Sequence, residues 1–281
     1  MRRNYRKAEI NMTDIQAEVN IKKKRGISLI SLLIDVFLIV TACIFICAFV
    51  NRKTIKADIV FLGDSIFGNV RDETSIPGMT ADALGMSFYN GGLGGTMCSP
   101  YQSGLNNDRK SSAFSLFYLS EAIRNNEFSF PLSAAPSVSD GDLEYFDGVV
   151  KELSKLDYAN SKMIIIEHGL NDFMSGVSAD VYYESMLCSV ENLLKIKSAD
   201  SIYILSPVYG KGDPGEYVKA GKKVADITGV HFIDMYNKGI VTKDNLDSST
   251  IDGIHLSKSA REEYAYILSE EIKKCSEENE N

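Results

Sequence analysis

The chain has 281 residues, of which 44% are hydrophobic and 24% charged, and its net charge is −8. That length allows one large domain or two small ones, and the composition is that of a globular protein, which excludes a disordered chain, a collagen and a multi-span membrane protein. Residues 1–56 hold 11 Lys and Arg and 4 Asp and Glu, whereas the remainder holds 19 Lys and Arg and 34 Asp and Glu. Such an acidic body repels the phosphate backbone, which excludes nucleic acid as an expected partner.

A long apolar run follows the basic amino-terminal segment. Residues 27–50 are 24 nearly uninterrupted apolar positions, enough to cross a hydrocarbon core of about 30 Å at about 1.5 Å per residue. Because Lys22 to Arg25 stand directly before this run, the positive-inside bias predicts a cytoplasmic tail over residues 1–26 and an extracellular body. The sequence therefore predicts a single-pass protein of the cell membrane.

The apolar run has two other interpretations. A cleaved signal peptide usually has a shorter apolar core and a good small-residue cleavage site, and the best site here, near Ala48, is poor, so we favour a retained anchor. Val40 to Cys43 loosely resembles a lipoprotein box, but apolar residues continue past it. A carboxylate inside a span suggests a function, yet Asp35 falls near the cytoplasmic interface if the span is counted from Leu32 to Val50, about 19 residues.

After a linker at residues 51–56, β-type runs alternate with helical patterns. Five short strands are predicted, at Ala57–Leu62, Met86–Tyr89, Met163–Ile166, Ile202–Leu205 and Phe232–Met235. Helices are predicted at Ser112–Arg124, Leu143–Leu156, Ala179–Lys197, Tyr217–Thr228 and Lys258–Lys274. This order predicts a three-layer α/β domain with a five-stranded parallel sheet over residues 57–275, ending in a frayed polar tail at 276–281.

Residues 97–160 are longer than one crossover between strands requires. They form an insertion placed to wall one side of a pocket, and between its two helical patterns lies a polar stretch at Phe130–Asp142. Phe114, Phe117 and Tyr118 recur at helical spacing in it, which favours an ordinary core face over a ligand-binding role.

Short polar clusters with glycines follow the predicted strands. They are Gly63-Asp64-Ser65 after the first, Asn90-Gly91-Gly92-Leu93-Gly94-Gly95 after the second, Gly169-Leu170-Asn171-Asp172 after the third, and Asp252-Gly253-Ile254-His255 in the loop after the fifth. In an open α/β sheet, ligands bind beyond the carboxyl ends of the strands. We therefore expect the four clusters to share one site.

The clusters contain the parts of a serine acyl-transfer site. A hydroxyl such as that of Ser65 needs an adjacent base, and a base such as His255 needs an acceptor such as Asp252 to hold its tautomer. Charge that develops on the carbonyl oxygen needs preorganised donors, which the amides of Ser65 and Gly95 and the side chain of Asn171 can supply.

The other two histidines are weaker candidates for the site, and the sequence lacks the motifs of other enzyme classes. His231 opens the last strand at its amino end, away from the proposed site, whereas His168 either lines the pocket rim or merely packs. The sequence has no GxSxG elbow, phosphate loop, dinucleotide fingerprint or HExxH motif, and its five cysteines fit neither a disulfide framework nor a metal site. We expect no cofactor and no metal.

The four clusters, each in order after a predicted strand, resemble the blocks of the SGNH hydrolase (GDSL esterase/lipase) family, which centre on Ser, Gly, Asn and His. The resemblance covers about residues 57–274. It implies a nucleophile at Ser65, a base at His255 oriented by Asp252, oxyanion-hole donors at Ser65, Gly95 and Asn171, and structural carboxylates at Asp64 and Asp172 that bond loop backbone.

The resemblance implies a flavodoxin-like α/β fold and a serine ester hydrolase that works through an acyl-serine. Within the family we favour removal of acetyl or another small acyl group from cell-surface or wall polysaccharide. A lysophospholipase, a thioesterase, an acyltransferase and a catalytically silent surface-binding module are the alternatives, and the silent module has no physical need for the complete set of Ser65, Asn171, Asp252 and His255. The sequence leaves the acyl chain length, the sugar and the oligomeric state open.

Overall fold

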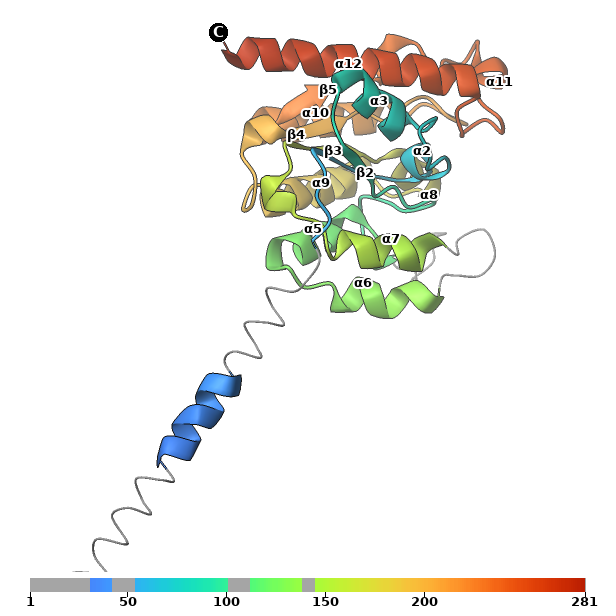
Figure 1. The fold of residues 1–281 in the computed structure, drawn as a ribbon. Helices are drawn as coiled ribbons and strands as arrows, with labels where there is room; N and C mark the ends of the chain where they lie inside the picture. The colour runs from blue at the N-terminus through green and yellow to red at the C-terminus, as the bar shows by residue number, and fades with distance from the viewer. Residues whose placement is uncertain (1–30, 42–53, 101–111, 138–144, 281) are drawn as a thin grey trace, which may run out of the picture. The chain divides into compact units, whose positions relative to one another are not determined.

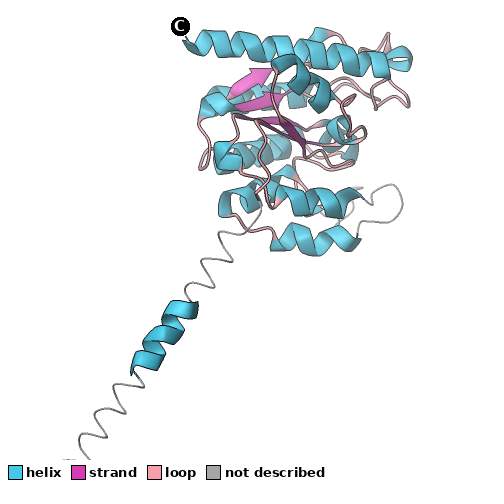
Figure 2. Cartoon of the chain, in the orientation of Figure 1, coloured by secondary structure: helices cyan, strands magenta, loops and turns pink. Residues whose placement is uncertain are grey.

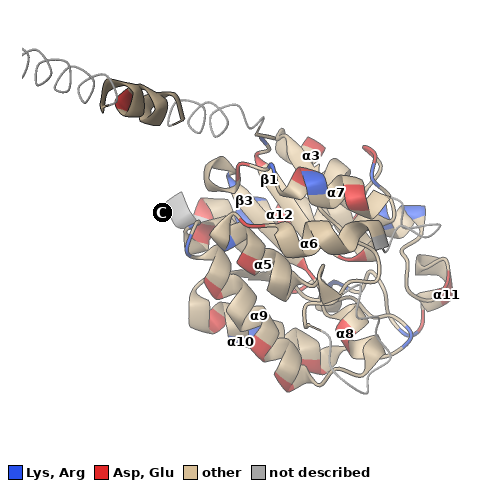
Figure 3. Cartoon of the chain, turned by 90° about the horizontal axis from the view of Figure 1, so that it is seen from below, with Lys and Arg blue, Asp and Glu red and all other residues tan. Residues whose placement is uncertain are grey.

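The computed structural model describes residues 31–41, 54–100, 112–137 and 145–280 and divides into two units, Met1–Lys53 and Thr54–Asn281. In the first unit residues 31–41 are helical, and large apolar side chains from Leu32 to Val40 are exposed. Figure 3 shows this helix without charge except at one acidic position, which the sequence identifies as Asp35.

Among the described residues, no helix is both long enough and apolar enough to span a bilayer. The remainder of the predicted span, residues 27–30 and 42–50, lies outside the described residues, as does the predicted tail at 1–26. The anchor and its orientation therefore stay predictions.

The second unit is built on a five-stranded parallel sheet, as predicted. Its strands are β1 (Ile59–Gly63), β2 (Phe88–Asn90), β3 (Met163–Glu167), β4 (Ile202–Leu205) and β5 (His231–Ile233). They lie in the order β2-β1-β3-β4-β5, and every neighbouring pair is parallel. This is the flavodoxin-like order, in which the chain reverses direction across the sheet between β1 and β3, and the crevice at that switch point is where ligands bind.

Helices cover both faces of the sheet, which makes three layers (Figures 1 and 2). Successive strand residues point to opposite faces, so Val60 and Ile164 belong to one core and Ile59 and Ile165 to the other. The first core includes side chains of α5 (Leu116–Asn125), α7 (Tyr145–Leu153), α9 (Ala179–Leu193) and α10 (Gly215–Thr228). The second includes side chains of α3 (Ile76–Leu84) and α12 (Lys258–Glu280).

Shorter elements complete the described fold. They are α2 (Ser65–Gly68), α6 (Ser129–Ala134), α8 (Leu170–Ser175) and α11 (Leu246–Ser249), with 3-10 turns at Ala135–Ser137, Tyr158–Asn160, Ala199–Ser201 and Tyr236–Lys238. Two of them, α2 and α8, follow β1 and β3 directly, at the switch point of the sheet.

Two predicted boundaries near the end of the chain differ from the structure. The last strand ends at Ile233 rather than Met235, because the chain turns there and the Met235 N–H donates to the Ile233 carbonyl at 3.0 Å. The last helix continues to Glu280, past the predicted end at Lys274 and into the predicted frayed tail. Ion pairs one turn apart, such as Lys274 Nζ to Glu271 Oε1 at 2.7 Å, favour this extension.

The helices α3 and α6 lie where no helix was predicted, as do the short helices α2, α8 and α11. α3 has a Ser75 cap, a proline in its first turn and Gly85 in the left-handed region at its end, which are helix start and stop signals that the sequence does contain. α6 overlaps the start of the stretch predicted to be polar, and its Phe130 ring packs edge-on against Tyr118 with centroids 5.1 Å apart. The predicted core role is confirmed for Phe114, which is fully buried, but not for Phe117 and Tyr118, which are half-buried.

Candidate active site

Ser65 is placed by a strand-to-helix turn at the carboxyl end of β1. Gly63 is needed there because a Cβ would lie 2.7 Å from the Phe67 ring and 3.0 Å from the Glu167 carbonyl. Asp64 then caps α2 by accepting a hydrogen bond from the Ile66 N–H at 2.8 Å. Ser65 is therefore the first residue of a short helix, and within the described residues its own N–H has no acceptor.

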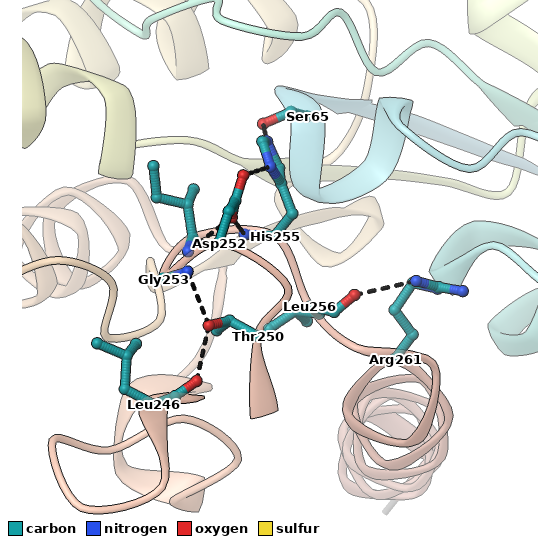
Figure 4. Close-up of polar contacts among 9 residues, drawn as sticks. Ser65, Leu246, Thr250, Asp252, Gly253, His255, Leu256 and Arg261 are labelled. Atoms are coloured by element: carbon teal, nitrogen blue, oxygen red, sulfur yellow. Dashed lines mark hydrogen bonds and ion pairs between the residues drawn. The ribbon is translucent and has the colours of Figure 1, made fainter. Parts of the chain in front are cut away.

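Three side chains form a continuous hydrogen-bonded chain in this site (Figure 4). The Nε2 atom of His255 lies 3.1 Å from the Ser65 Oγ, and its Nδ1 atom lies 2.7 Å from the Asp252 Oδ2. The other carboxylate oxygen of Asp252 accepts the N–H of His255 at 2.9 Å and that of Ile254 at 3.0 Å. The sequence placed Asp252 three residues before His255, and the turn folds both onto Ser65.

Hydrogen bonds within the loop that carries Asp252 and His255 hold it in place. Gly253 has a φ of +83°, a conformation that favours glycine, and its N–H donates to the Thr250 hydroxyl at 3.0 Å. That hydroxyl in turn donates to the Leu246 carbonyl at 2.7 Å. The loop therefore holds the imidazole in place through backbone as well as side-chain contacts (Figure 4).

The charge of Asp252 determines which nitrogen of His255 carries the proton. Burial raises the pKa of Asp252, but the hydrogen bonds from the backbone and ring of His255 outweigh it, so the pKa lies below its ordinary value. An ionised carboxylate can only accept, which assigns the proton to Nδ1 of His255 and leaves Nε2 as an acceptor facing Ser65. This is the tautomer that a general base needs.

The glycine-rich loop after β2 lies beside the nucleophile. A Cβ added to Gly94 would be 3.7 Å from the Cβ of Ser65. Gly95 has a φ of +74° and is exposed, and within the described part of the chain its N–H donates to no acceptor. Ser65 and Gly95 thus both present backbone N–H groups that are available to a developing oxyanion.

Two residues that the sequence prediction missed hold this loop in place. Arg71 donates to the Gly92 carbonyl at 2.7 Å and also to the Asn90 carbonyl, and its guanidinium lies 5.1 Å from the ring centroid of Tyr145. The Tyr145 hydroxyl accepts the Gly94 N–H at 2.8 Å. The predicted insertion therefore does reach the site, through the first residue of α7.

Asn171 lies in α8 and is bonded within the protein through its side-chain amide. Its Nδ2 donates to the Asp64 Oδ2 at 2.8 Å and to the Thr96 carbonyl at 3.0 Å. Turning one N–H toward an oxyanion would exchange the Thr96 contact for a charge-assisted hydrogen bond, which is the stronger kind. Its neighbour Asp172 is buried and accepts the backbone N–H groups of Cys98 and Ser99 at 2.8 and 3.0 Å.

Replacing Asn171 with alanine tests this role. We expect kcat to fall by about 10²- to 10³-fold, the usual cost of losing one oxyanion-hole donor. Steady-state hydrolysis of an aryl acetate measures it, and a thermal melt of the same variant separates this loss from unfolding, since Asn171 also contacts Asp64. A folded variant whose kcat stays within threefold of the original would show that the amide does not stabilise the transition state.

Asp64, which accepts a hydrogen bond from Asn171, is itself paired with the buried carboxyl group of Glu167. Burial raises the pKa of Asp64 to about 6, against hydrogen bonds from the Ile66 N–H and from Glu167 that lower it. Burial also raises the pKa of Glu167 well above its ordinary value, and the neighbouring charge of Asp64 raises it further. The sequence prediction included neither this residue nor its role, although a glutamate at the end of an apolar strand is an unusual feature.

His168 is buried and does not lie at a pocket rim. Its exposed fraction is 1%, burial lowers its pKa to about 3, and it lines none of the described pockets that adjoin the site. The alternative that it packs inside the protein is therefore the correct one. His231 stacks on Tyr203, with ring centroids 4.6 Å apart, away from Ser65 in the sheet.

A pocket of about 280 Å³ opens at Ser65 and His255. The other residues that line it are Ile66, Asn69, Val70, Ile251, Leu256 and Arg261. In the described ranges no group of three or more His, Cys, Asp or Glu side chains is arranged to hold a metal ion.

Comparisons with known proteins identify the fold. No protein-family model and no curated protein matches the chain. A protein from Lactobacillus plantarum has a similar structure, with a TM-score of 0.53 at 13% identity over 79% of this chain and 98% of that one. At this identity the likeness establishes the fold alone.

Two further structures have named activities. A family two carbohydrate esterase from Clostridium thermocellum, in complex with cellohexaose, has a TM-score of 0.51 at 17% identity over 78% of this chain and 63% of that one. The salicylyl-acyltransferase SsfX3 from a tetracycline biosynthetic pathway has a TM-score of 0.50 at 13% identity over 78% and 54%. The four sequence blocks that resemble those of the SGNH hydrolase family therefore meet at one edge of this fold, where Ser65, His255 and Asp252 are hydrogen-bonded.

Proposed function

We propose that the protein is an extracytoplasmic serine esterase that removes acetyl or another small acyl group from cell-surface or wall polysaccharide. The observation that carries the esterase chemistry is the hydrogen-bonded chain from Asp252 through His255 to Ser65, at 2.7 and 3.1 Å. It stands next to unengaged N–H donors at Ser65 and Gly95. Nucleophile, base and oxyanion donors therefore meet at one edge of the sheet.

The reaction proceeds in two halves. His255 accepts the Ser65 proton at Nε2 while the Oγ attacks the carbonyl carbon, and the N–H groups of Ser65, Gly95 and Asn171 hold the oxyanion. His255 then returns the proton to the leaving alcohol oxygen, and an acyl-Ser65 ester remains. Water attacks this ester with His255 again as base, which releases the carboxylic acid and restores Ser65.

The choice of a glycan substrate rests on two supports. A carbohydrate esterase that binds cellohexaose shares the fold, and the pocket at Ser65, at about 280 Å³, lies below the range of about 300–1,000 Å³ that is typical of drug-sized ligands. A pocket of this size favours one small unit of the substrate's alcohol half, such as a single sugar.

The ester panel is the experiment that tests this function. We expect the purified protein to hydrolyse aryl acetate faster than aryl butyrate, and aryl esters of long-chain acids least. Residues 52–281 as a soluble protein serve as a second sample, because unit Thr54–Asn281 contains the whole sheet and both cores. A folded sample that turns over no ester would indicate the silent binding module, and preference for long chains would indicate a lipase.

The proposed location rests on the sequence of the apolar run at residues 27–50 and its basic flank. The described portion, residues 31–41, is helical with exposed apolar side chains, which a lipid environment would cover. We expect protease added to intact spheroplasts to digest the body and spare an epitope tag on the amino terminus. Survival of the body, alongside digestion of a known surface protein, would show the orientation to be wrong.

A further inference from the structure

Arg261 is the one Lys or Arg that lines the pocket beside the nucleophile in the described structure. It lies in the first turn of α12 and donates through Nη1 to the Leu256 carbonyl at 3.0 Å (Figure 4). Its Nε is enclosed with no partner, and across the described residues the side chain makes no ion pair. One hydrogen bond therefore engages a guanidinium that carries five donors.

Asp72, a carboxylate whose pKa Arg261 lowers, forms no ion pair with it among the described residues. The pKa of Asp72 is lowered chiefly by hydrogen bonds from the Thr74 side chain and backbone, and Arg261 contributes a smaller effect from beyond ion-pair distance. A half-buried cation with few partners has already lost much of its hydration, so an anion that enters the pocket gains a strong, charge-assisted contact.

The rest of the lining strengthens such a contact. Ile66 and Leu256 are buried and Val70 is half-buried, and these apolar side chains limit the water around the guanidinium. The Asn69 side chain adds a neutral amide at the same pocket. Guanidinium groups bind carboxylate and phosphate through two parallel hydrogen bonds, which makes both groups suitable ligands.

The position of the pocket assigns it to one half of the substrate. Its lining includes Ser65 and His255 but neither Gly95 nor Asn171. The carbonyl oxygen of the ester must face the oxyanion donors, whereas the leaving alcohol oxygen must come within reach of His255, which protonates it. The pocket on the His255 side therefore receives the alcohol half of the ester.

We propose that Arg261 makes this esterase selective for esters whose alcohol half carries a carboxylate or a phosphate. The inference rests on the proposed function and narrows its substrate class to acylated acidic polymers. A carboxylate would come from a uronic acid unit of a glycan, and a phosphate from a polyol phosphate unit. Both sources share the chemistry that Arg261 recognises.

The test compares matched pairs of acetyl esters on the full chain in mild detergent. One pair is acetylated methyl glucuronide and acetylated methyl glucoside, and the other is acetyl glycerol phosphate and acetyl glycerol, with acetate release as the measurement. We expect kcat/KM for at least one charged member to exceed that of its neutral partner by about 10- to 100-fold. The pair with the larger ratio identifies the source of the anion.

Variants assign the selectivity to the guanidinium. Arg261→Met removes the charge at similar length, and we expect this variant to hydrolyse the charged and neutral members of a pair with about equal kcat/KM. We expect Arg261→Lys to retain part of the preference for the charged member. Lys258→Met is the matched control, since Lys258 is exposed in the same helical turn and lies outside the pocket. Its ratio should stay as in the original protein.

The outcomes separate this inference from the proposed function. Equal kcat/KM for both members of both pairs in the original protein overturns the role of Arg261 even if every ester is hydrolysed, and this result needs no variant to fold. Selectivity that survives Arg261→Met also overturns it. Failure to hydrolyse any ester, including aryl acetate, counts instead against the esterase itself.

Discussion

Replacing Ser65 with alanine lowers kcat for aryl acetate by about 10⁴- to 10⁶-fold, because the variant loses the oxygen that forms the acyl intermediate. His255 and Asp252 keep their own hydrogen bond at 2.7 Å, so the imidazole stays oriented but has no nucleophile to activate. The binding pocket and the oxyanion donors remain, which leaves a small residual rate above that in water. Steady-state kinetics on the purified variant measure the loss.

The matched control for this variant is Ser248→Ala. Ser248 is exposed in α11 and donates to the Asn245 carbonyl, so its removal changes a serine without touching the site. We expect its kcat to equal that of the original protein. A Ser65→Ala protein that keeps more than one hundredth of the activity, free of contaminating esterase, would require another nucleophile.

Replacing Asp252 with asparagine lowers kcat by about 10⁴-fold and leaves the fold intact. The amide oxygen can still accept the N–H groups of His255 and Ile254, which lie 2.9 and 3.0 Å from the present carboxylate oxygen. The amide nitrogen then faces Nδ1 of His255, and as a donor it forces the imidazole proton onto Nε2. Ser65 would face an N–H in place of a base, so it is no longer activated.

Two measurements on the Asp252→Asn variant test this role: kcat and the tautomer of the His255 imidazole. We expect nitrogen NMR of labelled histidine to report the proton on Nε2 in the variant and on Nδ1 in the original protein. Asp247→Asn is the control, because this acidic residue lies in the nearby α11 and contacts no member of the site. A decrease of less than tenfold in kcat with a normal melting temperature would show that Asp252 does not set the tautomer.

The parts of the site that follow strands could be predicted from sequence for a physical reason. The carboxyl ends of parallel strands share one edge of the sheet, so residues placed just after β1 and β3, such as Ser65 and Asn171, must come close together. The glycine-flanked turns mark where those strands end. The five strands and their parallel pairing follow from the same pattern and are confirmed, as is the flavodoxin-like strand order that the family resemblance implied.

The supporting contacts could not be predicted, because they depend on where separate segments cross. Arg71 holds carbonyls that lie 19 and 21 positions further along the chain, and the Tyr145 hydroxyl meets the Gly94 N–H from a different helix. In the sequence Glu167 is simply the residue that ends a strand. Its proximity to Asp64 follows only from the pairing of β1 with β3. The sequence does not distinguish Arg261 from the solvent-exposed charged residues of the same helix.

The site of covalent modification shows directly whether Ser65 is the nucleophile. The full chain is treated with a fluorophosphonate, and intact mass followed by peptide mapping locates the adduct. We expect one adduct per chain, on Ser65, formed rapidly in the original protein and slowly in Asp252→Asn. An adduct on any other residue, or none in a folded sample that hydrolyses aryl acetate, would contradict the assignment of Ser65, His255 and Asp252 as the catalytic chain.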